Sequence, residues 1–375
     1  MDQVMARKLQ QVGLAFNLPY PFFSYEEILN GNVNRTFKVN YIVDDGTGMA
    51  VLKPYLFQKI NSYAFHNPDE LMSNIDKVTE HIRTRRPEDV CLHFHHTEVG
   101  GVRRTYLEED DSFWRVYRYI EAVTFDKCED ERVIRSAGAA FGEFQTVLKD
   151  FDAEKLYYTI PDFHDTRKRY DKLLADAAAD PEGRVAECRE ELDYLISVQD
   201  TACRLTDLFN EGKLPLRVTH NDTKINNVLF DEKTLQPLVV IDLDTVMPGL
   251  VASDFGDAIR FVANFSEEDE KDTALTGLNL NAFWAFADGF LCQTAETLTE
   301  LEKETLALSC FPITCELATR FLDDYIIGDK YFKTKYPGHN LVRTRCQIAL
   351  AKDMQRKKEA MEAIVKSCAE KYSAK

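Results

Sequence analysis

Residues 217–244 read RVTHNDTKINNVLFDEKTLQPLVVIDLD, and this stretch decides the fold. Two short apolar runs, NVLF and PLVVID, alternate with polar, turn-like segments, which predicts two short strands joined by a turn. The first polar segment carries His220, Asp222 and Asn227 in the spacing H-x-D-x-x-x-x-N. The second apolar run leads into Asp242. Polar side chains at the ends of short strands are expected to share a cleft, so these residues are candidates for a single site.

The residue types at these positions suit phosphoryl transfer. That reaction needs a carboxylate that orients the acceptor hydroxyl or takes its proton, and oxygen ligands that hold Mg²⁺ on the phosphates. Asp222 fits the first requirement, and Asn227 and Asp242 fit the second. Either motif alone would as often cap a helix or close a turn, so the inference rests on both motifs occurring in order. For His220 we expect a structural role, in which it braces the loop by hydrogen bonds.

The predicted secondary structure changes near residue 120, from strands before it to helices after it. Before it, residues 36–43 and 50–60 have extended character on either side of the turn DDGTG and predict a hairpin. Residues 101–120 predict two more strands, GVRRTYL and SFWRVYRYI, joined by the acidic turn EEDD. From residue 131 onward most segments are helical by pattern. By analogy, this order predicts an α+β, protein-kinase-like fold with a β-rich N-terminal lobe and a larger, mainly helical C-terminal lobe.

Composition limits the classes of partner. The chain has 375 residues and a formal charge of −17, which opposes non-specific binding to nucleic acid or to an anionic membrane surface. No segment approaches the ~20 apolar residues of a membrane helix, and residues 1–18 predict an amphipathic helix instead of a secretory signal. The nine cysteines form no CxxC pair and no zinc-like spacing. We therefore expect a soluble, cytoplasmic protein without nucleic-acid or membrane partners, and the sequence leaves its oligomeric state open.

In HNDTKINN and VIDLD the chain resembles the aminoglycoside phosphotransferase and choline kinase superfamily. Five stretches spread over nearly the whole chain are similar to those of the N-acetylhexosamine 1-kinases: YLFQKINSYAFHNPDELMSNI, THNDTKINNVLF, VIDLDTVMPG, DFGDAIR and ELATRFLDDYIIGDKYF. The resemblance implies Mg²⁺-dependent transfer of the ATP γ-phosphoryl group to the anomeric hydroxyl of N-acetylglucosamine or N-acetylgalactosamine. It makes Asp222 the catalytic base and Asn227 and Asp242 the magnesium ligands, and it implies that Arg320 faces the sugar.

The nucleotide is expected in the first lobe, residues 1–119, and the catalytic and sugar-binding groups in the second lobe, residues 120–375. The candidate phosphate loop is residues 31–36 (GNVNRT), where backbone amides would cover the nucleotide. With one glycine in place of three, this loop departs from the glycine-rich pattern, and an ordinary hairpin turn fits it about as well. Asn34 and Arg35 could supply donors that the missing glycines do not.

A lysine on the third strand is expected to reach the α and β phosphates. Lys59 directly follows an apolar run, as the resemblance suggests, and Lys53 is the alternative. The sequence does not decide whether Glu70 or Glu80 is its helical partner, and either residue fits a solvated helical charge. The adenine is expected to contact backbone groups where the strand-rich part meets the helical part, near Arg118, Tyr119 and Ile120.

Four further charged positions are candidates near the acceptor. Lys224, two residues after the proposed base, is expected to direct its ammonium toward the phosphoryl group in transfer. From the residues alone, Arg320 in RFLDDY would pair with a neighbouring carboxylate, and only the resemblance makes it a sugar contact. A neutral sugar needs mixed donors and acceptors, which Asp323 and Asp324 could help to supply.

Two motifs suggest metal binding, but their residues fit other roles better. Asp254 lies in SDFGDAIR, twelve residues after Asp242, and is expected to cap a helix and brace the catalytic loop. The histidines of His93-Phe94-His95-His96 are predicted to lie in an exposed strand without a nearby cysteine or acidic ligand, and are expected to be solvated.

Two other functions stay open as hypotheses. One is a kinase for another small acceptor, such as choline, an aminoglycoside or a different sugar. The other is a protein kinase or a pseudokinase. No activation segment ending in APE follows Asp242, and the three chemical residues of the motif are all present, which opposes this last hypothesis.

Overall fold

The computed structural model describes the chain in four stretches, residues 2–18, 21–29, 34–62 and 65–373. The chain forms two compact units, Met1–Ala122 with Leu156–Ile160, and Val123–Lys155 with Pro161–Lys375.

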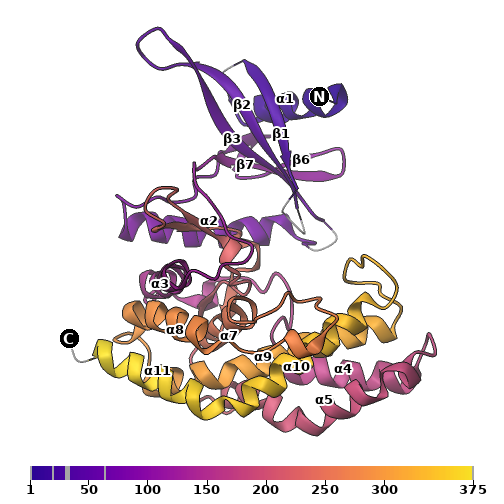
Figure 1. The fold of residues 1–375 in the computed structure, drawn as a ribbon. Helices are drawn as coiled ribbons and strands as arrows, with labels where there is room; N and C mark the ends of the chain where they lie inside the picture. The colour runs from indigo at the N-terminus through magenta and orange to yellow at the C-terminus, as the bar shows by residue number, and fades with distance from the viewer. Residues whose placement is uncertain (1, 19–20, 30–33, 63–64, 374–375) are drawn as a thin grey trace. The chain divides into compact units, whose positions relative to one another are not determined.

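The first unit contains an antiparallel sheet of five strands in the order β1-β2-β3-β7-β6 (Figure 1). Its strands are β1 (Phe22–Ile28), β2 (Arg35–Asp44), β3 (Ala50–Ile60), β6 (Leu107–Glu109) and β7 (Ser112–Arg118). Its other elements are α1 (Gln3–Ala15), α2 (Pro68–Arg85) and the small hairpin of β4 (Thr97–Val99) and β5 (Val102–Arg104). The predicted hairpin is confirmed, because β2 and β3 pair antiparallel along their whole length.

Helix α1 covers one face of this sheet. The predicted amphipathic helix is confirmed: Leu9 and Val12 of α1 are fully buried in one cluster with Phe37 and Val39 of β2. Alternate strand residues point to the same face, so the odd-numbered positions of β2 and β3 form this core. The helix lies so close to the sheet that a Cβ at Gly13 would stand 1.9 Å from Tyr41 Oη.

Residues 101–107 are not the single strand that was predicted. Their first part pairs with β4, and Leu107 begins β6, which pairs with β7. The turn between β6 and β7 is confirmed in the acidic segment, where Asp110 and Asp111 have φ of 49° and 53°. Positive φ at both central residues matches the right-handed twist of a tight hairpin. β7 ends at Arg118, two residues before the end of the predicted strand.

The second unit is mainly helical, as predicted. Its α-helices are α3 (Glu131–Val147), α4 (Thr166–Ala179), α5 (Arg189–Ala202), α6 (Arg204–Asn210), α7 (Val251–Val262), α8 (Leu280–Thr294), α9 (Glu300–Ile326), α10 (His339–Arg356) and α11 (Lys358–Ser373). Short 3₁₀ turns are η1 (Ala153–Lys155), η2 (Val185–Cys188), η3 (Ile225–Asn227), η4 (Leu243–Thr245) and η5 (Thr273–Leu275). The long helix α9 is central, because α4, α5, α7, α10 and α11 all pack against it (Figure 1).

Helices α3 and α8 approach each other through glycines. A Cβ at Gly138 would stand 2.3 Å from the carbonyl oxygen of Phe286, and one at Gly289 would stand 1.9 Å from that of Arg135. Both distances are far shorter than van der Waals contact, so only glycine permits this helix separation. The pair forms a tightly packed layer of the second unit.

Two small hairpins interrupt the helices. The predicted strands of residues 217–244 are confirmed as β9 (Val228–Phe230) and β10 (Pro237–Val240), which pair antiparallel. A second hairpin joins β8 (Arg217–Thr219) to β11 (Met247–Gly249). Among the described residues, no helix has both the length and the apolar character needed to cross a membrane.

Candidate active site

The loop after β8 carries the H-x-D motif and is anchored by one buried carboxylate of α7. Asp254 is 2% exposed. Its Oδ2 accepts the backbone N–H of His220 at 2.8 Å, and its Oδ1 accepts that of Asn221 at 2.7 Å. Burial raises the pKa of Asp254, and the two backbone donors oppose that shift. The expected bracing role of Asp254 is confirmed, but it is not a helix cap, because the N-cap of α7 is Leu250 and no side chain bonds there.

His220 braces the same loop, as expected. Its ring is fully buried between Phe141 and Phe144. Nε2 donates to the carbonyl of Ile241 at 2.8 Å, and Nδ1 accepts the backbone N–H of Asp222 at 3.3 Å. A carbonyl can only accept and an amide N–H can only donate, so these bonds require the proton on Nε2. His220 therefore joins the catalytic loop to the residue that precedes Asp242.

The three residues of the predicted constellation come together around these bonds. Asn227 Nδ2 donates to Asp222 Oδ2 at 3.1 Å and to the Asp222 carbonyl at 2.8 Å. The Asn227 carbonyl accepts the backbone N–H of Ile241 at 2.8 Å. Asp242 directly follows Ile241, so this bond holds the Asp242 backbone beside Asn227. The sequence motif thus predicted a real spatial cluster, although the chemical roles of its members stay predictions.

Two backbone outliers mark the cluster. Asn221 has φ of 62° and Asp242 has φ of 57°, both in the left-handed region. Asparagine and aspartate tolerate this region better than other non-glycine residues, and such conformations gather at functional sites. Asn221 is held by its own side chain, whose Nδ2 donates to the carbonyl of Thr245 at 2.8 Å.

The residues fit the magnesium ion that phosphoryl transfer uses. Because Asn227 Nδ2 is turned toward Asp222, the amide oxygen of Asn227 is left for a cation, and Asp242 adds an exposed carboxylate. Both are hard oxygen ligands, and a magnesium ion that is bound to phosphates takes only one or two carboxylates from the protein. The described stretches contain no cluster of three or more His, Cys, Asp or Glu residues suited to a metal.

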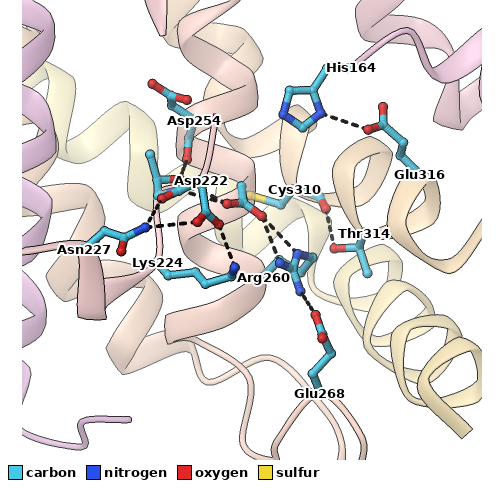
Figure 2. A network of polar contacts seen from close by, with 12 residues as sticks. His164, Asp222, Lys224, Asn227, Asp254, Arg260, Glu268, Cys310, Thr314 and Glu316 are labelled. Carbon is cyan, nitrogen blue, oxygen red and sulfur yellow. Dashed lines mark hydrogen bonds and ion pairs between the residues drawn. The ribbon is translucent and has the colours of Figure 1, made fainter. Parts of the chain in front are cut away.

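Lys224 forms an ion pair with the proposed base. Its Nζ lies 2.7 Å from Asp222 Oδ1, and each of the two side chains is 28% exposed. The Asp222 carboxylate raises the pKa of Lys224 above its usual value against the opposing effect of burial, and Asp257 adds to the rise. Figure 2 shows Lys224 and Asn227 approaching Asp222 from two sides.

A second group of charged side chains, Asp257, Arg260 and Glu268, also supports the loop that carries Asp222. Asp257 accepts the Thr223 backbone N–H at 3.0 Å and pairs with Arg260 at 2.9 Å, and Arg260 pairs with Glu268 at 2.7 Å. Burial would lower the pKa of Arg260, but the two carboxylates raise it above the usual range. Sequence reasoning did not identify Asp257 and Arg260. Their three-residue spacing after Asp254 in SDFGDAIR, which places them on one helix face, was the available signal.

A small pocket adjoins this charge group. It is bordered by Arg260 and Glu268 and by the polar side chains of Asn264, Ser266 and Gln347. Gln347 is fully buried, and neither of its amide atoms has a hydrogen-bond partner among the described residues. Buried amides of this kind bind water or a polar ligand group.

Arg320 acts on the buried carboxylate of Glu316, one helical turn before it, through charge alone, and helps to hold the pKa of Glu316 below its usual value. Among the described residues it forms no ion pair or hydrogen bond. Its guanidinium instead lies over three aromatic rings, at 5.3 Å from Phe163, 5.8 Å from Tyr331 and 5.5 Å from Phe332. Cation–π contacts hold the group in place without using its N–H donors.

One turn before Arg320, Glu316 is buried and bonded to two side chains. It accepts Thr166 Oγ1 at 2.7 Å and lies 2.8 Å from His164 Nδ1 (Figure 2). Burial would raise the pKa of Glu316, but His164 and the Thr166 hydroxyl hold it below its usual value. Glu316 therefore fixes the start of α4 and the loop that presents Phe163.

Asp323 and Asp324 are already bonded within the protein. Asp323 pairs with Lys172, which also binds Asp176 at 2.5 Å, and burial raises the pKa of Asp323 to about 6. Asp324 accepts three backbone N–H groups of the following loop. Asp323 Oδ1 has no hydrogen-bond partner among the described residues, and a sugar contact stays a prediction for Asp323. The bonds of Asp324 give that residue a structural role instead.

The predicted nucleotide residues lie in the first unit. Residues 31–33 of the candidate phosphate loop fall outside the described stretches. Asn34 Oδ1 accepts the backbone N–H of Asn61 at 2.9 Å, and Arg35 pairs with Glu27 at 2.9 Å. The Arg118 backbone N–H donates to the His93 carbonyl at 3.2 Å. The next two residues of the predicted adenine contact, Tyr119 and Ile120, follow β7 without regular structure.

Neither candidate lysine has an ion pair among the described residues. By strand alternation Lys53 and Lys59 share the face of Phe57, which α1 covers. The opposite face carries Gln58, which accepts Arg115 Nε at 2.9 Å. That alternation was readable from the sequence.

Two further positions near the nucleotide residues can be compared with the expectations. Glu80 pairs with Arg83 at 2.6 Å and its side chain is 69% exposed, which fits the solvated helical charge. His93 and His96 are exposed, as expected, but His95 is half-buried, and burial lowers the pKa of His95 to about 4.

Comparison with known proteins identifies the family. The sequence pattern of the phosphotransferase enzyme family, APH, matches residues 24–285. The chain belongs to the phosphotransferase enzyme family. Within solved structures, the fold is similar to an aminoglycoside phosphotransferase from Alicyclobacillus acidocaldarius, with 13% identity, coverage of 96% of each chain and a TM-score of 0.58.

Two further structures share the fold of this phosphotransferase. A microcompartment-associated aminopropanol kinase has 16% identity and a TM-score of 0.60, over 95% of this chain and 98% of that one. Plasmodium vivax ethanolamine kinase has 13% identity and a TM-score of 0.56, over 92% of this chain and 89% of that one. These likenesses establish the kinase-like fold with its sheet-containing N-terminal part and larger helical C-terminal part.

Proposed function

We propose that this phosphotransferase is an anomeric sugar kinase, which transfers the γ-phosphoryl group of ATP to the C1 hydroxyl of N-acetylglucosamine or N-acetylgalactosamine. The observation that carries the transfer chemistry is the Asp222 carboxylate, held between the Asn227 amide at 3.1 Å and the Lys224 ammonium at 2.7 Å. A solved member of the same fold, a spectinomycin phosphotransferase, binds ADP and its acceptor, which supports an adenine nucleotide as donor.

In this proposal the oxygen of the acceptor hydroxyl bonds to the γ-phosphorus, and Asp222 takes the proton of that hydroxyl. The bond from that phosphorus to the β–γ bridging oxygen breaks, and ADP leaves with the bonding electrons. Asn227 and Asp242 would hold Mg²⁺, which neutralises phosphate charge when bound. Asn227 also aims the Asp222 carboxylate, and Lys224 stabilises negative charge next to it.

The choice of acceptor rests on charge. Among the described residues Arg320 forms no ion pair or hydrogen bond, so its N–H donors stay available to an acceptor, whereas the carboxylates of Glu316 and Asp324 are bonded within the protein. The Arg320 guanidinium repels a cationic acceptor and donates readily to a carbonyl or hydroxyl oxygen. This favours a neutral sugar over choline, ethanolamine or an aminoglycoside, and it agrees with the resemblance of five stretches to the N-acetylhexosamine 1-kinases.

A panel of alcohols tests this proposal. With ATP and Mg²⁺, N-acetylglucosamine or N-acetylgalactosamine should be turned over at least about tenfold faster, in kcat/KM, than choline, ethanolamine and an aminoglycoside. Phosphorus and proton NMR should place the phosphate on C1. Phosphate at C6, or good turnover of a cationic alcohol without turnover of either sugar, would reject the anomeric sugar kinase in favour of a kinase for another acceptor.

Lys224→Met should lower kcat by about 10²-fold, roughly 3 kcal/mol, and leave both KM values within a few-fold. A fixed cation beside developing phosphoryl charge stabilises the transition state more than the ground state. Steady-state kinetics with each substrate varied in turn will measure this split. The matched control is Lys233→Met, in the exposed turn between β9 and β10, which should behave as the parent. A kcat within about threefold of the parent for Lys224→Met would exclude the lysine from the chemistry.

A further inference from the structure

The loop that follows α9 is folded around one carboxylate. Asp324 lies in the last turn of α9 and is 2% exposed. Its side chain accepts three consecutive backbone N–H groups, from Lys330 at 2.8 Å, Tyr331 at 2.7 Å and Phe332 at 2.9 Å. Its fourth bond comes from Asn340 Nδ2 at 2.9 Å. A carboxylate has about four lone-pair sites, so these donors use its accepting capacity fully.

The backbone before these donors makes their convergence possible. Gly328 and Asp329 have φ of 101° and 57°, two successive left-handed residues. Turns of this kind direct consecutive N–H groups into one concavity that binds an anion. Asp329 is itself fixed by Arg184 at 2.7 Å and by Asn340 at 2.8 Å.

This concavity also explains how Asp324 is stabilised at its position. The C-terminal end of a helix carries partial negative charge, which disfavours a carboxylate in the last turn. The four donors offset this cost for Asp324. Their loss would leave a buried, unpaired charge at the wrong end of a helix, so the loop and Asp324 depend on each other.

The loop presents two of the three rings around Arg320. Tyr331 and Phe332, whose backbone N–H groups bind Asp324, place their rings 5.8 and 5.5 Å from the Arg320 guanidinium. The Phe332 ring also packs against Phe321 at 4.7 Å. Asp324 and Arg320 are one helical turn apart on α9, so one carboxylate sets the backbone whose rings hold the Arg320 guanidinium.

We infer that Asp324 is a positioning residue for the acceptor: it folds residues 328–332 so that Tyr331 and Phe332 hold Arg320 ready to bind the sugar. This inference rests on the proposed function for the identity of the acceptor. It assigns Asp324 no contact with substrate, because its lone pairs are occupied by the loop and by Asn340.

Asp324→Asn tests the inference. The amide replaces one accepting oxygen with an N–H₂ group that faces other donors, so the loop should open. The KM for the acceptor should rise at least about tenfold, while the KM for ATP should stay within about twofold and kcat at saturating acceptor within about threefold. Phe332→Leu is a milder second variant that leaves the Asp324 bonds intact, and it should raise the acceptor KM alone by a smaller factor.

A second readout needs no substrate. Lys330, Lys333 and Lys335 provide tryptic sites in and beside the loop. In Asp324→Asn, cleavage at these lysines should be about tenfold faster under native conditions, since proteolysis follows the population of the open form. The matched control is Asp353→Asn, which removes a buried carboxylate that accepts the Leu278 backbone N–H at 2.7 Å elsewhere in the same unit. It should leave the acceptor KM and the loop cleavage rate unchanged.

The outcomes separate the inference from the proposed function. An unchanged acceptor KM in Asp324→Asn, or equal increases in the KM values of acceptor and ATP, overturns the positioning role. If the alcohol panel identifies another acceptor, the proposed sugar specificity fails, but the same KM split is measured with that alcohol. Unchanged tryptic cleavage would overturn the inference whichever acceptor is used.

Discussion

Asp222→Asn should lower kcat by about 10²- to 10⁴-fold while ATP affinity stays within a few-fold of the parent. The substitution keeps the size of the side chain but removes the group that takes the acceptor proton. Nucleotide binding depends on other residues, so only the chemical step should suffer. Single-turnover kinetics will measure the chemistry, and calorimetric titration with ATP and Mg²⁺ will measure binding.

The control for this variant is Glu232→Gln, which removes an exposed carboxylate from the nearby turn between β9 and β10. It should have parental kcat and parental ATP affinity. If Asp222→Asn retained a kcat within about tenfold of the parent, another group would have to take the proton. If it lost ATP binding together with turnover, its role would be to organise the nucleotide site and not to act on the acceptor.

Asp254→Asn should lower both the stability and kcat. An asparagine offers one accepting oxygen where two backbone N–H groups and Gln145 now bind the carboxylate. One buried donor is left unsatisfied, which costs about 2 kcal/mol of unfolding free energy. The loop that carries Asp222 also loses its anchor, and a displacement near 1 Å of a reacting group costs about 10²-fold in rate.

Thermal unfolding and steady-state kinetics on Asp254→Asn will measure the two effects. The control is Asp288→Asn in α8, where a carboxylate of equal burial, 2% exposed, pairs with Arg135 and Lys371. It should lower the stability but leave kcat near that of the parent. Equal effects of the two variants on kcat would show that Asp254 contributes only general stability and does not fix the catalytic loop.

Local pattern predicted the catalytic hairpin well. Strand length, turn residues and motif spacing are local properties, and they placed Asn227 and Asp242 beside two short strands that pair and Asp222 in the loop before them. The bracing role expected of His220 and Asp254 followed from the same argument. The failure at residues 101–107 arose because a continuous apolar-polar pattern does not reveal that the chain changes strand partner within it.

The acceptor side was less predictable because its contacts join distant parts of the chain. The rings around Arg320 come from Phe163 and from residues 331–332, and no spacing rule connects those positions. The structural role of Asp324 depends on the left-handed backbone at Gly328 and Asp329, of which the sequence indicates only the glycine. Strand alternation, by contrast, could have shown that Lys59 shares the α1-covered face of β3.

The glycine contact between α3 and α8 has a consequence for laboratory evolution of this enzyme. At Gly138 and Gly289 the tolerated volume is set by the separation of two backbones and not by any neighbouring side chain that could be trimmed in compensation. Libraries that exchange core residues for altered acceptor preference can therefore vary the surroundings of α9, but they should hold these glycines constant. A larger residue at either position would clash with backbone atoms of the facing helix. Only a shift of the whole helix would remove this clash, and no second-site substitution supplies such a shift.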